Sequence, residues 1–95
     1  MIIAADDWLD RLLRALADPT RRRLFALLLE TPGLSTAQLT AAAGGMSRWG
    51  VMKHLALLRE AGLIQTMEAG RERRHYPETA ALGPLNEWLN SVGSG

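Results

Sequence analysis

The chain has 95 residues, of which 47% are hydrophobic and 22% are charged, and it contains no cysteine. This length and composition fit one globular domain over residues 1–95, and the lack of cysteine excludes disulfide bonds, thiolate metal sites and thiol redox chemistry. No apolar run approaches the roughly 18 residues of a membrane-spanning helix, and the N-terminus has no signal-peptide pattern. The lack of cysteine is also compatible with a reducing cytoplasm.

The charges are spread unevenly along the chain, although the formal net charge is only +1. Residues 1–20 hold two arginines against four aspartates, and residues 77–95 hold two glutamates and no Lys or Arg. Between them, residues 21–76 carry nine Lys and Arg side chains against four acidic ones. A basic middle attracts a polyanion, but a solvated surface with chance clustering of charge gives the same pattern, so charge alone leaves both interpretations open.

Helical spacing of apolar residues marks both ends of the chain. Residues 5–17 present a wide apolar stripe, which predicts an amphipathic helix. Asp18 can cap a second helix and Pro19 suits its first position, so we expect that helix to run to residue 30. Gly83-Pro84 begins a last helix with apolar residues up to Val92.

Two capped helices separated by a glycine break lie in the middle of the chain. Ser35 and Gln38 have capping-box spacing, which predicts a short helix that ends by Gly44. Ser47 then caps a helix over residues 47–60, and Gly62 is placed to stop it in the left-handed conformation. This order of elements is typical of a helix-turn-helix.

A β-hairpin is predicted directly after the second of these helices. Strand-like residues 63–68 and 73–76 flank a turn at Glu68-Ala69-Gly70-Arg71. Three arginines lie at or near the tip, namely Arg71, Arg73 and Arg74. Alternation along the strand puts Arg71 and Arg73 on one side and Arg74 on the other, so not all three need to touch the same ligand. A helix-turn-helix followed by such a hairpin is the winged form of the motif.

The helix over residues 47–60 has two distinct faces. Val51, Leu55 and Leu58 recur at helical spacing and predict a face that packs on the core. The other face carries Ser47, Arg48, Trp49, Met52 and Lys53. In a helix that enters the DNA major groove, cationic side chains reach guanine and the helix start holds a phosphate. For a lone helix the alternative is that Trp49 packs in a core or dimer contact while the cations are merely solvated.

Three segments resemble one known family: LADPTRRRLFALLL (16–29), MSRWGVMKHLALLREAGLI (46–64) and GRERRHYP (70–77). Through them the chain is similar to the ArsR/SmtB family of winged helix-turn-helix regulators, over nearly its whole length, and is most similar to the branch without metal ligands. The resemblance implies a homodimer through the first and last helices and cytoplasmic repression of transcription.

Metal sensing is not expected. Metal-sensing members of that family carry a cysteine pair in or before the first helix of the motif, or acidic and histidine ligands on the last helix. Here the first position reads STAQLTAAAG, and the last helix offers Asn86, Glu87 and Asn90 without a histidine. We interpret His54 as a packed, hydrogen-bonded structural residue and His75 as a paired strand residue, so we predict no metal and no cofactor.

The two terminal helices also favour a dimer on physical grounds. Their apolar faces are too wide for a three-helix core with a hairpin to cover in 95 residues. The residues that we assign to the interface are Trp8, Leu9, Leu12, Leu85, Trp88 and Leu89. A two-fold dimer would set two reading helices about 34 Å apart and require an inverted-repeat operator. The alternative is a monomer whose terminal helices close over the core.

We therefore predict a mainly α fold with a small β-hairpin, a winged helix-turn-helix that dimerises through its N- and C-terminal helices. Its predicted function is a dimeric, sequence-specific transcriptional repressor, with helix 47–60 in the major groove and wing 63–77 on the backbone or minor groove. The predicted DNA contacts are Gln38, Ser47, Arg48, Trp49, Met52, Lys53, Arg71, Arg73 and Arg74. The alternative is a winged-helix protein-interaction module. The scattered acids and two histidines build no catalytic set, and any small-molecule effector is unspecified.

Overall fold

The computed structural model describes residues 4–93, and for residues 4–6 only the backbone; the remainder of the predicted 1–95 domain lies outside the described residues. Its elements in chain order are α1 (Ala4–Leu16), α2 (Pro19–Glu30), β1 (Leu34–Ser35), α3 (Thr36–Ala42), α4 (Arg48–Glu60), β2 (Ile64–Ala69), β3 (Glu72–Pro77), the 3₁₀ helix η1 (Thr79–Leu82) and α5 (Gly83–Gly93). The predicted helices and hairpin are thus confirmed to within one or two residues at most ends. No helix between residues 4 and 93 is long and apolar enough to span a bilayer.

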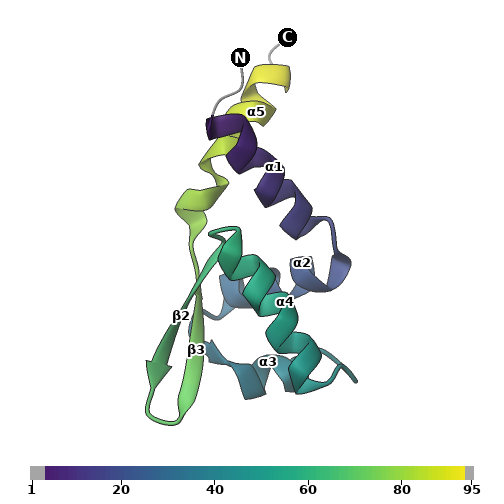
Figure 1. Cartoon of the computed structure of the whole chain (residues 1–95), viewed down its shortest axis with the longest axis vertical. Coiled ribbons are helices and arrows are strands. Elements are labelled where there is room, and N and C mark those ends of the chain that lie inside the picture. The colour runs from purple at the N-terminus through teal and green to yellow at the C-terminus, as the bar shows by residue number, and fades with distance from the viewer. Residues whose placement is uncertain (1–3, 94–95) are drawn as a thin grey trace.

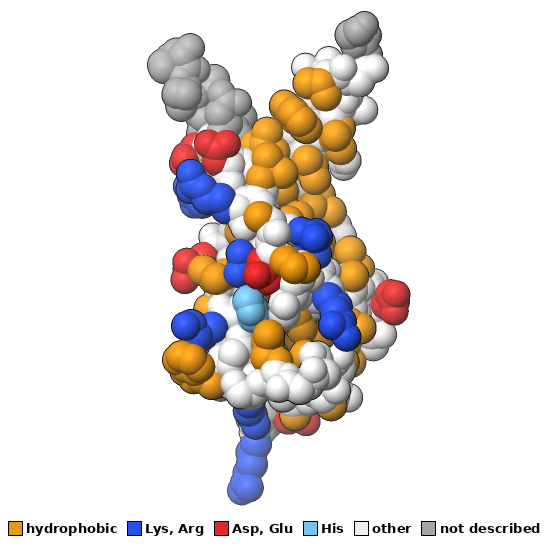
Figure 2. All heavy atoms as spheres, turned by 90° about the vertical axis from the view of Figure 1, so that its right-hand side faces the viewer, with side chains coloured by type: hydrophobic (Ala, Val, Ile, Leu, Met, Phe, Trp, Pro, Cys, Tyr) orange, Lys and Arg blue, Asp and Glu red, His pale blue; other side chains and the backbone are white. Residues whose placement is uncertain are grey.

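The molecule is elongated, with extents of 46 × 25 × 22 Å. Helices α1 and α5 lie together at one end, whereas the start of α4 and the turn between β2 and β3 lie at the other (Figure 1). Figure 2 shows apolar side chains gathered along the helices at the first end, and Lys and Arg side chains mostly over the middle and the second end. The fold therefore separates an apolar end from a cationic end.

The core lies where α1, α2, α3 and α4 meet the hairpin. Most of the core side chains with less than 2% exposure are leucines: Leu12, Leu24, Leu28, Leu39, Leu55, Leu58 and Leu63, with Val51. Removing apolar surface of this size from water is the main driving force for folding. Because α4 contributes three of these residues, its position is fixed by the core.

The predicted helix caps are present. The Asp18 carboxylate accepts a hydrogen bond from the backbone N–H of Arg21 at 3.0 Å, and Pro19 opens α2. Ser35 and Gln38 form both bonds of a capping box at the start of α3. Each cap satisfies a backbone N–H that has no partner inside its own helix. Because only a few residue types can do this, the helix starts can be recognised from the sequence.

Arginines of α2 fix the corner between α1 and α2. Arg21 Nε donates to the carbonyl of Ala15 at 2.7 Å, and Arg22 Nη1 donates to the carbonyl of Leu16 at 2.7 Å. The last carbonyl groups of a helix receive no hydrogen bond from an N–H group of the same helix. Cations near them also interact favourably with the helix dipole. The arginine run after Asp18-Pro19 thus holds the C-terminal end of α1 against α2.

The hairpin belongs to a three-stranded antiparallel sheet with the order β1-β3-β2. Strand β1 pairs Leu34 with His75 and was not predicted, because two residues are too few to show an alternating pattern. In the hairpin, Thr66 pairs with His75 and Glu68 with Arg73. Gly70 adopts φ +67° in the turn, a conformation that favours glycine.

Candidate nucleic-acid interface

Helix α4 has the two faces that the sequence predicts. Val51, Leu55 and Leu58 are at most 1% exposed, so one flank is clamped in the core. On the other flank Trp49 is 68% exposed and Met52 45% exposed, and Arg48 and Lys53 are exposed as well. The alternative in which Trp49 packs inside the fold is therefore excluded for the single chain.

The start of α4 is capped and presents polar groups to solvent. Ser47 Oγ accepts from the backbone N–H of Gly50 at 3.0 Å, which leaves the preceding N–H groups without a partner inside the helix. A Cβ added at Gly50 would lie 3.1 Å from Met46 Cγ, so the glycine lets Met46 pack across this helix turn. Free N–H groups with the positive end of the helix dipole are suited to bind a phosphate.

Trp49 and Lys53 form a pair on the outer face of α4. The Lys53 ammonium lies 4.5 Å from the centroid of the Trp49 ring, within the range of a cation–π contact. The two residues are four apart in a helix, so their side chains lie over each other. This contact holds an aromatic ring and a cation together in solvent, next to Arg48.

Gln38, which the sequence analysis predicts as a DNA contact, also forms part of the capping box at the start of α3. Its side-chain oxygen accepts from the backbone N–H of Ser35 at 2.8 Å, and its own backbone N–H donates to Ser35 Oγ. The residue is exposed, so its amide group is still open to solvent. Contact between Gln38 and DNA stays a prediction.

The three wing arginines are not equivalent. Arg71 and Arg73 are exposed. Arg74 instead donates to the carbonyl of Gly33 at 3.0 Å and forms a 2.8 Å ion pair with Glu72. Arg74 is therefore tied to the protein, which leaves Arg71 and Arg73 as the wing cations that face solvent.

Arg59 is a cation near this surface that sequence reasoning missed. Together with Arg73, Thr66 and Glu68 it lines an open hollow of about 280 Å³ between α4 and the hairpin. Its Nη1 donates to Thr66 Oγ1 at 3.1 Å. Arg59 follows Met52 by seven residues, which places both on the same face of α4 and is the signal that could have identified it.

His75 is buried where α3, β2 and β3 meet. Its Nε2 lies 2.8 Å from Thr36 Oγ1, and its Nδ1 lies 2.9 Å from Thr66 Oγ1. Burial lowers the pKa of His75 to about 4, with further lowering by the positive charges of Arg59 and Arg73. His75 is thus neutral at pH 7 and ties the wing to the helix-turn-helix, which confirms its structural interpretation.

His54 connects α4 to the corner between α1 and α2. Its Nδ1 lies 3.3 Å from Arg21 Nη1 and 3.9 Å from the Asp18 carboxylate. The backbone hydrogen bond from Arg21 and the nearby positive charges hold the pKa of Asp18 below its usual value. The packed, hydrogen-bonded role predicted for His54 is confirmed.

Five of the six predicted dimer residues keep exposed surface in the single chain, and the sixth does not. Trp8 is 37% exposed, Trp88 46% and Leu89 48%, while Leu9 and Leu85 are half-buried. Leu12 differs from the prediction, because its side chain is fully buried in the core of the single chain and has no surface to offer a partner. Helical spacing placed it on the correct face of α1, but that face already packs on the chain's own helices.

Sequence comparison identifies relatives that regulate transcription. The sequence model of the family described as "Helix-turn-helix domain" matches residues 16–66. The HTH-type transcriptional regulator CmtR of Mycobacterium tuberculosis and that of Mycobacterium bovis are each 43% identical to the chain over 67 residues. This alignment covers 70% of the chain and 55% of the relatives, so the chain spans about half the length of these curated relatives.

Solved structures show the same fold. An ArsR family transcriptional regulator superposes with a TM-score of 0.84 at 30% identity, over 94% of this chain and 90% of that one. An ArsR-like transcriptional regulator from Rhodococcus sp. RHA1 gives a TM-score of 0.82 at 28% identity, over 97% of this chain and 85% of that one. Both matches include the terminal helices as well as the helix-turn-helix and the hairpin.

Proposed function

Because the chain belongs to the ArsR family of winged helix-turn-helix transcriptional regulators, we propose that it binds double-stranded DNA in a sequence-specific manner as a homodimer and represses transcription in the cytoplasm. The observation that carries this proposal is the division of α4. One flank is fixed in the core, and the opposite flank exposes Arg48, Trp49 and Lys53. A reading helix needs both properties at once.

In the proposed complex, the first two turns of α4 enter the major groove. Arg48 and Lys53 would donate to the O6 and N7 acceptors of guanine, and the Trp49 ring would pack on a sugar or a thymine methyl. Ser47 and the open N–H groups at the helix start would bind a phosphate. To do so, Lys53 must leave the Trp49 ring or carry the ring with it, so the pair would rearrange on binding.

The wing supplies the second part of the proposed interface. Arg71 and Arg73 face solvent on the hairpin, and the hairpin tip lies at the same end of the molecule as the start of α4 (Figure 1). Contacts from these arginines to phosphates or the minor groove would add affinity for any sequence and set the register of α4. Arg74 would act mainly by holding the wing in place through Gly33.

The proposed dimer uses the apolar end of the molecule. Trp8, Trp88 and Leu89 expose indole and aliphatic surface that water solvates poorly, and Val92 is 56% exposed beside them on α5. Packing α1 and α5 against a second copy would remove this surface from water. Two-fold symmetry then implies an operator with two inverted half-sites.

Selection of bound DNA from a random pool, followed by anisotropy titration, tests the proposal. We expect an inverted repeat to be enriched, and Arg48→Ala or Lys53→Ala to weaken binding by about 1–3 kcal/mol. Arg23→Ala is the matched control, since it removes an exposed arginine of α2 that lies outside the outer face of α4, the wing and the terminal helices. Absence of any enriched sequence, or equal affinity for all three variants, would refute the proposal and favour a protein-interaction module.

A further inference from the structure

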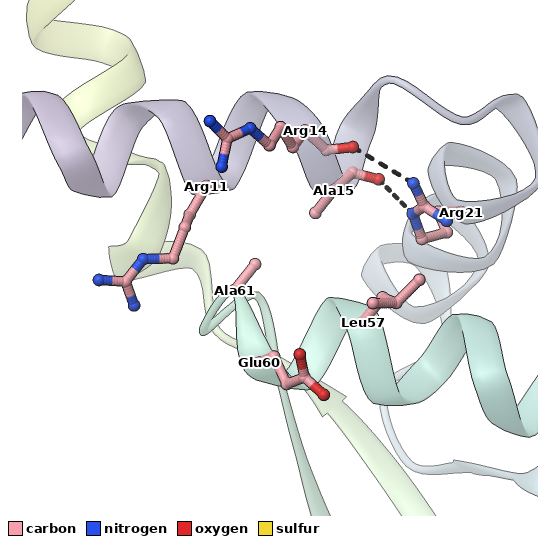
Figure 3. Close-up of a pocket in the computed structure, with 7 residues that line it drawn as sticks. All are labelled: Arg11, Arg14, Ala15, Arg21, Leu57, Glu60 and Ala61. Atoms are coloured by element: carbon pink, nitrogen blue, oxygen red, sulfur yellow. Dashed lines mark hydrogen bonds between the residues drawn. The ribbon is translucent and has the colours of Figure 1, made fainter.

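A second concave site lies between α1 and α4, away from the outer face of α4. This α1–α4 hollow has a volume of about 220 Å³ and is lined by Arg11, Arg14, Ala15, Arg21, Leu57, Glu60 and Ala61. Its lining is mostly apolar at the floor, where Ala15, Leu57 and Ala61 approach one another from the two helices (Figure 3). The charged side chains stand around this floor.

Arg21 is held at the edge of the hollow by hydrogen bonds to backbone carbonyls and a histidine ring, and none of these partners is a carboxylate that would neutralise its charge. Its Nε and Nη2 donate to the carbonyls of Ala15 and Arg14, at 2.7 and 3.2 Å (Figure 3), and its Nη1 lies 3.3 Å from His54 Nδ1. A guanidinium has five N–H donors, so two remain for another acceptor. Arg21 is therefore a fixed cation whose remaining donors an anion can use at little cost in side-chain ordering.

Arg14 supplies a second cation of a different kind. In the part of the chain that the structure describes, its side chain makes no hydrogen bond or ion pair, whereas Arg11 beside it is paired with Asp7 at 3.1 Å. Glu60 is the acidic group on the rim. The hollow thus combines a fixed arginine, a free arginine and an apolar floor, with one carboxylate that disfavours a second negative charge on any ligand.

We propose that the α1–α4 hollow binds a small aromatic monocarboxylate, with its ring on the apolar floor and its carboxylate on the remaining donors of Arg21. The Arg14 side chain, which points along α1 away from Arg21 in Figure 3, would turn toward the bound carboxylate and supply the second guanidinium group. The hollow, at about 220 Å³, is smaller than the roughly 300 to 1,000 Å³ of pockets for drug-sized ligands, so it suits a ligand with a single ring. Bidentate donation by arginine suits a planar carboxylate. An uncharged ring of the same shape would lose both charge-assisted contacts.

The location also gives the ligand a regulatory effect, a step that rests on the proposed function. The hollow has one wall on α1, which carries part of the proposed dimer face, and another on α4, which carries the proposed reading face. A ligand that fills it would fix the spacing of these helices, and any preference for one spacing changes DNA affinity by the same factor as DNA changes ligand affinity. Binding of the ligand to the free protein can be measured without DNA.

The test is a titration of the full chain, labelled with ¹⁵N, with sodium benzoate and with benzamide, its uncharged isostere. A ligand of this size is expected to bind with a Kd of about 1 mM, so titration to about 20 mM reaches saturation. We expect benzoate to move the amide signals of residues 11–21 and 57–61 and to bind at least about tenfold more tightly than benzamide. Because this titration contains no DNA, its result does not depend on whether the proposed DNA-binding function is correct.

Three variants test the assignment of the residues. Arg14→Gln should weaken benzoate binding at least about threefold, and Glu60→Gln should strengthen it, because each changes the charge on the rim. Arg23→Gln removes the same charge from an exposed position of α2 outside the hollow, and should leave the affinity unchanged. Equal binding of benzoate and benzamide, signals that move only on α5, or no saturable change would overturn the proposal.

Discussion

The buried histidine of the wing makes the stability of the fold depend on pH in a defined direction. Folding lowers the pKa of His75 from 6.5 to about 4, because the ring is buried and faces Arg59 and Arg73. Between these values the unfolded chain binds more protons than the folded one, so the free energy of unfolding falls as pH falls. The contribution is complete above about pH 6.5 and is lost progressively towards pH 4.

The size of the effect follows from the two pKa values. Going from pH 7.5 to pH 5, the linkage relation gives a loss of about 2 kcal/mol from His75. That is a large fraction of the roughly 5–15 kcal/mol by which small domains are stable. Asp18, whose pKa folding lowers from 3.8, stays ionised over this range, so its own contribution is lost only at lower pH.

Urea unfolding followed by tryptophan fluorescence at pH 7.5 and pH 5 measures this loss. The matched variant is His75→Gln, which keeps polar atoms in the cavity but has no proton to gain. Whatever its stability at pH 7.5, its change between the two pH values should be about 2 kcal/mol smaller than that of the unmodified chain. His54 is present in both proteins and cancels in the comparison. Equal pH dependence of the two would refute the reasoning.

Three further predictions concern packing and the wing. Leu55→Ala empties a fully packed site in the core and should lower the free energy of unfolding by about 2–5 kcal/mol, measured in urea. Gly62→Ala should cost about 1–3 kcal/mol by the same assay, because Gly62 has φ +78° and a Cβ would lie 3.2 Å from Trp8 Cη2. Arg73→Ala should weaken binding to all DNA sequences alike and reduce the salt slope by about one, whereas a change at Arg48 should alter sequence preference.

What the sequence predicted well was set by neighbouring residues. In each of the caps at Asp18, Ser35 and Ser47, the side chain accepts from the backbone N–H three residues later. This short, fixed spacing can be recognised from the sequence alone. The two faces of α4 followed in the same way from helical periodicity. Burial of Val51 and exposure of Trp49 needed no knowledge of what packs against the helix.

What it missed depended on distant segments. His75 is bonded to Thr36, 39 residues earlier, and no local pattern marks that pairing. Leu12 lies on the apolar face of α1 as predicted, but periodicity does not say whether such a face meets its own chain or a partner. The carbonyl contacts of Arg21 likewise require the angle between α1 and α2, which only the packed core defines.

The contacts of Arg21 also connect α1 with α4. This side chain binds the last carbonyls of α1 and lies against His54 of α4, so a shift of one helix along the other must break or stretch these hydrogen bonds. Packed elements joined in this way move between discrete arrangements rather than deforming continuously. The corner around Arg21 is therefore where a change in the packing of α1, from a second chain or from a ligand in the α1–α4 hollow, would first reach the exposed face of α4.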